Sequence, residues 1–174
     1  MTAADSCAGG GRDSPLPLNK AEWGEKIMVT HAFIGSWSLV SSVFKNEEGT
    51  VSHPLGEQVL GRINYEANGT MAAQLYSAVR PKFTSSDPAQ GTDSELRSAF
   101  INMICYYGRY QIDEPDQRVI HQVEGCSFPN WIGSRQVRFY TFTDDKLTLR
   151  TVPLQIGNGV QIGELVWQRI GDAP

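Results

Sequence analysis

The stretch Gly35-Ser36-Trp37 opens a run of alternating polar and apolar residues, and Trp167-Gln168-Arg169 closes the last such run near the C-terminus. A glycine lets a strand bend into the base of a small β-barrel, a tryptophan fills that base, and an arginine can lie flat on the indole. The two segments therefore predict a closed up-and-down barrel whose first and last strands meet. The alternative is a tryptophan in another kind of β core.

Between these two segments the sequence predicts about eight antiparallel strands in consecutive order. Asn68-Gly69 lies between two alternating runs, which is the strongest short signal for a hairpin. The expected strands cover residues 33–45, 58–65, 70–76, 106–112, 118–124, 136–143, 146–152 and 161–170. A closed antiparallel barrel of this size has room for one small ligand.

Two helices are expected beside the strands. Residues 1–18 are polar and rich in Gly and Pro, which predicts a disordered tail before a single domain over residues 19–174. A capping motif at 19–22 predicts a short N-terminal helix that covers one end of the barrel. Thr92 and Glu95 form a second capping box, which begins an amphipathic helix near residues 93–104. We expect this helix to lie across the barrel mouth as a lid or against the side.

The composition narrows the class of partner. Apolar residues make up 40% and charged residues 20% of the chain, and the formal net charge is −4. These values are ordinary for a soluble domain and give no reason to expect nucleic acid or membrane as a partner. No secretory signal is evident, and the three cysteines have no paired spacing, so we expect a cytoplasmic protein.

Several motifs resemble the lipocalin-like domain family over roughly residues 33 to 170. They are Gly35-Ser36-Trp37-Ser38-Leu39-Val40-Ser41, His53-Pro54-Leu55-Gly56, Asn68-Gly69-Thr70-Met71-Ala72-Ala73-Gln74-Leu75, Tyr106-Tyr107-Gly108-Arg109-Tyr110 and the block from His121 to Gly133. The resemblance implies a calycin-type all-β barrel with an internal pocket. Members occur in bacteria and in fungal natural-product gene clusters, and some fungal ones resemble cofactor-independent cyclases and isomerases. Many others have no known activity, so the resemblance defines the fold better than the chemistry.

No motif for a metal or a cofactor is visible. His31, His53 and His121 are scattered along the chain, and no Cys/His pair has the spacing of metal ligands. No glycine-rich loop follows a strand in the way that a phosphate site requires. We therefore expect neither a metal nor a cofactor, and the candidate chemistry rests on polar side chains of the strands.

His121 and Arg109 are the leading catalytic candidates. Every second side chain of a barrel strand faces the lumen, and both residues lie among apolar and aromatic neighbours on central strands. We expect both to face inward. His121 can act as an acid or base, and Arg109 can stabilise an enolate or oxyanion. The alternatives are a hydrogen-bonded core histidine, and an ion pair of Arg109 with Glu124 or an aspartate.

Tyr107 and Glu124 complete the catalytic set. Tyr107 can donate to a carbonyl, and Glu124 can orient His121 or act as a base; the alternatives are a wall residue and an ordinary surface carboxylate. The aromatic loop 128–133 is expected to fold over one end of the barrel, as a ligand rim or as a packed closure. The candidate ligand contacts are Gln74, Tyr76, Phe100, Asn130, Trp131, Arg138 and Tyr140.

Two functions follow from this pattern. The first is a cofactor-independent cyclase or isomerase, or a dehydratase, that acts on a small hydrophobic natural-product intermediate held in the barrel. The second is a non-catalytic protein that binds or carries a small hydrophobic or aromatic ligand. A homodimer that pairs through the outer walls is left open.

Overall fold

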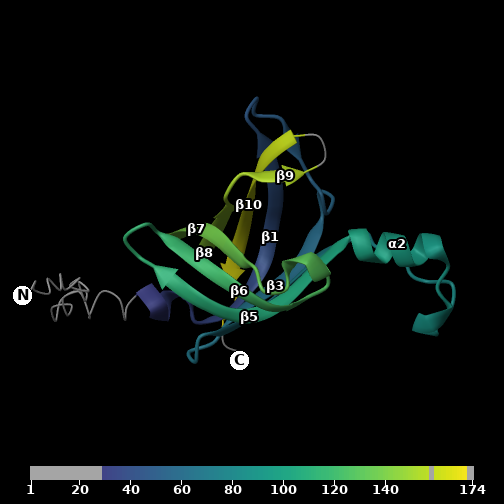
Figure 1. Ribbon diagram of the computed structural model, residues 1–174, viewed down its shortest axis with the longest axis horizontal. Helices are drawn as coiled ribbons and strands as arrows, with labels where there is room; N and C mark the ends of the chain where they lie inside the picture. Colours follow the sequence, from purple (N-terminus) through teal and green to yellow (C-terminus); the bar gives the residue numbers. More distant parts are fainter. Residues whose placement is uncertain (1–28, 157–158, 172–174) are drawn as a thin grey trace, which may run out of the picture.

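The computed structural model describes residues 29–156 and 159–171. Within them, eight antiparallel strands close into a barrel, because the first of the eight pairs with the last. The eight are β1 (Gly35–Asn46), β3 (Val59–Tyr65), β4 (Thr70–Ser77), β5 (Met103–Asp113), β6 (Arg118–Cys126), β7 (Arg135–Thr143), β8 (Lys146–Thr151) and β10 (Gly159–Arg169). The predicted all-β barrel with consecutive strand order is confirmed (Figure 1).

Two short strands extend the sheet beyond the barrel. β2 (Val51–Ser52) pairs with the end of β1, and β9 (Leu154–Ile156) pairs with the start of β10. Both extensions lie at the same end of the molecule in Figure 1.

The hairpin between β3 and β4 forms where Asn-Gly predicts it. Gly69 has a φ of 82°, which favours glycine. The Asn68 side chain accepts hydrogen bonds from the backbone N–H and the hydroxyl of Thr70, at 3.0 and 2.7 Å. The strands then pair in register from Tyr65 opposite Met71. This turn decides that Tyr65 faces the interior.

One end of the barrel is closed by the residues expected to close it. Trp37 is almost fully buried, and its indole N–H donates to the Phe33 carbonyl at 2.9 Å. The guanidinium of Arg169 lies over the Trp37 ring and donates to the carbonyls of Ala32 and Ile34. Residues 29–33 are helical and bring Phe33 into this end. The expected tail and the helix through Trp23 and Ile27 lie outside the described residues.

The interior of the barrel is packed with apolar and aromatic side chains. Alternate residues of each strand are buried, as the period of two predicts. The buried apolar set of the strands includes Leu39, Ile63, Met71, Ala73, Leu75, Val119, Val123, Leu147, Leu149 and Trp167. Each large member contributes about 1.5–3 kcal/mol when its side chain is fully buried.

The helix between β4 and β5 differs from its expected extent and place. α2 (Asp93–Ile101) begins at the predicted capping box of Thr92 and Glu95, and it follows the single turn η1 (Pro88–Gln90). The extension to residue 104 is wrong, because Met103 and Ile104 pair with β4 as the start of β5. Strand pairing from residue 103 ends the helix two residues earlier.

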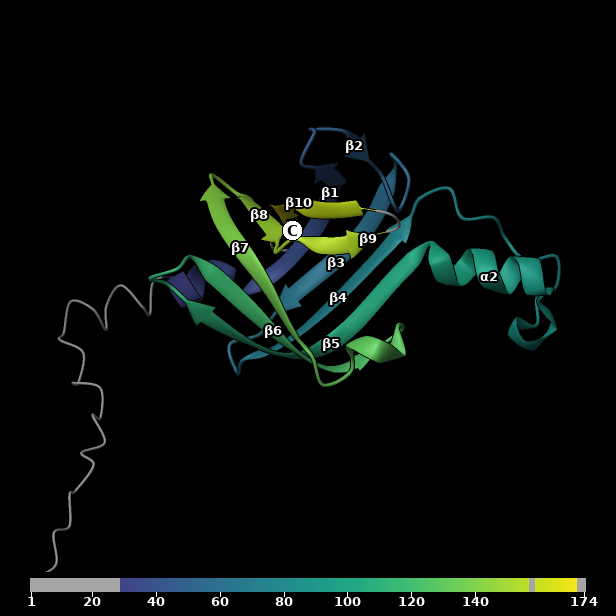
Figure 2. The ribbon, with the colours of Figure 1, turned by 45° about the horizontal axis from the view of Figure 1, so that its top comes forward.

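α2 neither covers the barrel mouth nor lies against the barrel wall. It buries none of its residues, and Figures 1 and 2 show it extending away from the barrel. The two expected positions are therefore both wrong. The helix continues almost directly into β5, so the direction of that strand carries it outward. No helix among the described residues has the length and apolar character needed to cross a membrane.

Candidate functional site

His121 lies at the centre of the barrel interior. It is on β6, opposite Tyr110 of β5 and Gln136 of β7, and its exposed fraction is 0%. The expected inward orientation of His121 is confirmed. The adjacent Gln122 is exposed, as alternation along a strand requires.

Both ring nitrogens of His121 contact a tyrosine hydroxyl. Nε2 lies 2.8 Å from the hydroxyl oxygen of Tyr65, on β3, and Nδ1 lies 3.0 Å from that of Tyr106, on β5. The three side chains form a buried hydrogen-bonded chain across the interior. Gly108 takes the inner face between Tyr106 and Tyr110, and the Gln122 carbonyl of β6 occupies the space that a Cβ atom there would need.

The hydrogen-bonded side chains of Tyr65, His121 and Tyr106 are all uncharged near pH 7. Burial, and secondly the positive charge of Arg138, lower the pKa of His121 from 6.5 to about 3. Burial raises the pKa of both Tyr65 and Tyr106, and the charge of Arg138 opposes this in each case. The imidazole is therefore neutral, and both hydroxyls keep their protons.

Arg138 is a buried cation that has no carboxylate partner within the described ranges. It is 7% exposed and lies on β7, where it is the diagonal neighbour of His121 across the β6–β7 pair. Its guanidinium donates to the Val137 carbonyl at 2.8 Å and to Oε1 of Gln136 at 3.4 Å. None of the ion pairs between described residues includes Arg138. A buried charge is costly unless it is paired, so the buried guanidinium of Arg138 lowers the stability of the folded chain.

Aromatic rings surround this polar centre. Phe33 makes edge-to-face contacts with Tyr65 and Tyr140, with centroid distances of 5.2 and 4.9 Å. Tyr65 makes a further edge contact with Tyr110 at 4.9 Å. Tyr140, a predicted ligand contact, is buried as expected for the lumen face. Aromatic rings therefore pack directly around the Tyr65–His121–Tyr106 chain.

The aromatic loop folds against the barrel end opposite residues 29–33 (Figure 2). It contains η2 (Pro129–Trp131), and the Trp131 ring meets Tyr106 edge-to-face at 6.1 Å. Trp131 is half-buried and packs against the core, whereas Asn130 is exposed. The predicted inward fold of the loop holds for Trp131, which links the rim to the His121 network.

Arg109, Tyr107 and Glu124 lie on the outer face of the barrel, so the inward orientation expected for Arg109 is wrong. The Arg109 and Glu124 side chains are 61% and 51% exposed and form an ion pair at 3.5 Å. Tyr107 lies over Gly125 on the outside. The physical reason is alternation, because Tyr106, Gly108 and Tyr110 take the inner face of β5. Apolar neighbours along a strand do not indicate which face a charged residue takes.

Gln74, Tyr76 and Phe100 also lie away from the interior. Gln74 and Tyr76 line a shallow groove on the outer wall of β3 and β4, together with Leu60. The Tyr76 hydroxyl accepts from Sγ of Cys105 at 3.2 Å. Phe100 is on α2 and is 45% exposed. These three residues are not brought together with His121 and Arg138.

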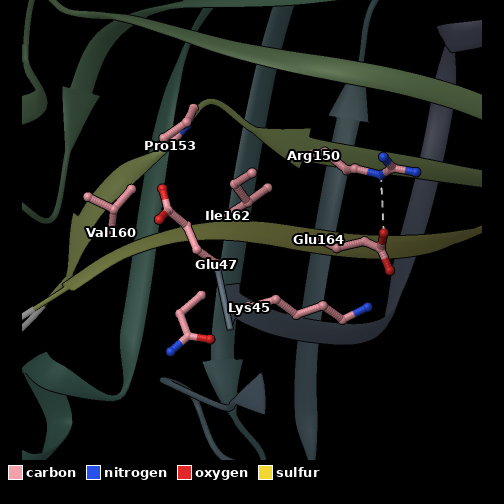
Figure 3. Close-up of a pocket in the computed structure, with 8 residues that line it drawn as sticks. Lys45, Glu47, Arg150, Pro153, Val160, Ile162 and Glu164 are labelled. Atoms are coloured by element: carbon pink, nitrogen blue, oxygen red, sulfur yellow. Dashed lines mark ion pairs between the residues drawn. The ribbon is translucent and has the colours of Figure 1, made fainter. Parts of the chain in front are cut away.

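A second groove crosses the outer wall near the β1 end and β10 (Figure 3). Its lining is of mixed charge, with Lys45 from the end of β1, Glu47 from the turn that follows, and a 3.1 Å ion pair between Arg150 and Glu164. The opposite charges offset one another, and the groove presents no single class of ligand contact. Among the described residues, no three His, Cys, Asp or Glu side chains lie close enough together to hold a metal ion.

Sequence reasoning missed Tyr65 and Tyr106, which are the direct partners of His121. Tyr65 is 56 residues from His121 along the chain, and only strand order brings the two together. A signal for Tyr106 was present, because the alternative face of its strand is Tyr106, Gly108 and Tyr110 without a charge. The less polar face of this strand, which contains Tyr106, is the one that faces the interior.

The comparisons with known proteins agree with this architecture. The family model described as a lipocalin-like domain matches residues 34–170. A protein of Aspergillus oryzae (strain ATCC 42149 / RIB 40), named as a 4'-hydroxy-3'-methoxypropiophenone carrier protein, is 36% identical over 107 residues. The match covers 58% of this chain and 96% of that protein. No solved structure matches the chain.

Proposed function

This chain belongs to the lipocalin-like domain family, and we propose that it binds a small oxygenated aromatic molecule inside its barrel and releases it unchanged. The class of ligand is a phenol or aryl ketone. The function is that of a carrier or store. Such a molecule matches the ring-lined interior and supplies oxygen atoms to its polar centre.

The observation that carries the proposal is the buried position of Arg138. Its guanidinium has five N–H donors, and it makes two hydrogen bonds to described residues, to the Val137 carbonyl and to Oε1 of Gln136. A ligand oxygen beside it would compensate the buried charge. Residues retained for binding often cost stability in the free protein, and a buried arginine without a carboxylate is such a cost.

The name of the Aspergillus relative supports the ligand class. The compound in that name carries a phenol, a methoxy group and a ketone on one ring. Each of these oxygens accepts hydrogen bonds, and the ring is flat. We therefore choose this compound, called here the phenolic ketone, as the first probe.

The interior offers less support for the cyclase or isomerase expectation. Of the four catalytic candidates, only His121 faces inward, and its pKa of about 3 makes it a poor base near neutrality. Both of its ring nitrogens already contact tyrosines. These features favour binding over proton transfer.

Equilibrium dialysis of the full chain against the phenolic ketone, followed by mass detection, tests the proposal. We expect the ketone to accumulate with the protein at equal mass and to be recovered intact after unfolding. Arg138→Met should reduce retention about tenfold or more, because charge-assisted hydrogen bonds are lost. Arg135→Met, an exposed arginine on the same strand, is the matched control and should retain the ketone normally.

Two outcomes contradict this proposal. A product of different mass or retention time that forms only with protein would indicate catalysis. Equal retention by the native chain and by Arg138→Met would remove the polar centre from the binding site.

A further inference from the structure

The Tyr65–His121–Tyr106 chain leaves one hydroxyl proton without an acceptor. A neutral imidazole has one N–H donor and one bare nitrogen that accepts. It therefore accepts from one tyrosine and donates to the other. The tyrosine that receives the imidazole N–H still has its own O–H, which has no acceptor in the described parts of the chain.

The surroundings of the two tyrosines decide which one carries this free proton. Tyr65 is fully buried, with edge contacts to Phe33 and Tyr110. A free O–H there would stay unsatisfied at a dry position, which is costly. Tyr106 is also buried, at 8% exposed, but it lies beside the half-buried Trp131 at the rim. Tyr65 therefore donates to Nε2, Nδ1–H donates to Tyr106, and the Tyr106 O–H is free.

Most of the other buried groups that lack a partner among the described residues are also donors; the exception is Oε1 of Glu114, in the turn between β5 and β6. Arg138 has N–H groups beyond the two hydrogen bonds that it makes, and it has no acceptor atom. The indole N–H of Trp167 is buried without a partner among the described residues. A neutral phenol brings a proton that needs an acceptor, whereas a phenolate or a carbonyl brings lone pairs alone. Because donors outnumber acceptors here, the interior favours a phenolate or carbonyl oxygen over a neutral phenol.

We propose that Tyr106 and Arg138 form a pair of donors that holds the ligand's phenol oxygen in its ionised form. On binding, the phenol O–H bond breaks, the electron pair stays on oxygen, and the proton passes to solvent. The phenolate then balances the charge of Arg138. His121 is a positioning residue, since its tautomer directs the Tyr106 proton toward the ligand. This inference rests on the proposed function, because it names the form in which that ligand is bound.

Both donors lie near His121. Tyr106 reaches Nδ1 of His121, and Arg138 is the diagonal neighbour of the same histidine on the next strand. Both side chains therefore belong to the same polar centre around His121. The effect of the Arg138 charge on the pKa of Tyr106 agrees with this closeness.

The tautomer is measured first, in the ligand-free full chain. Long-range proton–nitrogen correlation spectra distinguish a protonated Nδ1 from a protonated Nε2, and His121→Asn assigns the signal among three histidines. We expect His121 with a proton on Nδ1. A proton on Nε2 would place the free hydroxyl on Tyr65 and overturn the inference. Because no ligand is present, this result does not depend on the proposed function.

The ionisation state of the bound phenolic ketone is measured second. Phenolates of para-acyl phenols absorb at longer wavelength than the neutral phenols, so a difference spectrum at a pH one unit below the solution pKa of the probe reports the bound form. We expect the phenolate band with the native chain. Tyr106→Phe should weaken binding about tenfold and reduce the phenolate fraction, and Arg138→Met should do the same. Tyr107→Phe on the outer face is the control and should leave the spectrum unchanged.

The outcomes separate the two proposals. A probe that binds as neutral phenol overturns the donor-pair inference and leaves the carrier proposal intact. A probe that fails to bind overturns both. A methyl ether of the probe, which cannot ionise, should bind at least tenfold more weakly than the phenol. Equal affinity for the ether would also overturn the inference.

Discussion

The guanidinium of Arg169 lies over the indole of Trp37, with its Cζ atom 4.0 Å from the ring centroid. The same guanidinium donates to the carbonyls of Ala32 and Ile34, which precede β1. One side chain from the last strand thus fastens the first strand and the residues that close the barrel end.

Replacement of Arg169 by alanine should lower the free energy of unfolding by about 2–4 kcal/mol. The loss combines a cation–π contact with two charge-assisted hydrogen bonds. Urea denaturation followed by tryptophan fluorescence measures it. Arg150→Ala breaks an exposed ion pair with Glu164 and should cost less than about 1 kcal/mol. Equal losses in the two variants would contradict the sealing role of Arg169.

The buried imidazole of His121 predicts a loss of stability in acid. Its pKa is about 3 in the folded chain, whereas the unfolded value is about 6.5. The unfolded state therefore binds one more proton between these values. The contribution of the neutral His121 to the free energy of unfolding should be complete above pH 6.5. Below that pH the free energy of unfolding should fall by up to about 1.4 kcal/mol per pH unit.

Direct titration of the ring by NMR checks this without a variant. The His121 signals should stay those of a neutral imidazole down to the pH at which the chain unfolds. Protonation of His121 near pH 6 in the folded chain would contradict its burial in a neutral network.

Gly108 should tolerate no side chain. A Cβ atom at this position would lie 2.0 Å from the Gln122 carbonyl oxygen, where the β5–β6 register shifts. Gly108→Ala should destabilise the chain by about 3 kcal/mol or more, or prevent folding. Gly159→Ala is the matched control, since no described residue lies within 4 Å of the Cβ atom that the alanine would add. Similar melting temperatures for both variants would contradict the described bulge.

Arg138→Met should leave the free energy of unfolding unchanged or raise it, by up to about 3 kcal/mol. Removal of a buried charge without a carboxylate partner removes a desolvation cost, and methionine fills a similar volume. Urea denaturation in the absence of ligand measures the change. A large loss of stability would indicate that Arg138 is a structural residue.

The outline of the fold could be predicted because local chemistry decides it. The glycine and tryptophan at 35–37, the turn at Asn68-Gly69 and the capping box at Thr92 each act over a few residues, and each is found where the pattern placed it. The direction of α2 could not be predicted, because it depends on where β5 lies in the closed barrel. That direction is a property of tertiary structure.

The candidate site was predicted in part. His121, Arg138 and Tyr140 take the inner face, whereas Arg109 takes the outer face. Apolar neighbours of Arg109 in sequence are not its neighbours in space, because adjacent strand residues face opposite sides. The tyrosines that bond His121 come from other strands, so strand register was needed to find them.

The most direct test of the account is a calorimetric titration of the full chain with the phenolic ketone, repeated on Arg138→Met and Arg135→Met. The account predicts one site per chain, an affinity about tenfold or more weaker for Arg138→Met, and an unchanged affinity for Arg135→Met. Equal affinities for the native chain and Arg138→Met, or no heat of binding in any of the three, would contradict it.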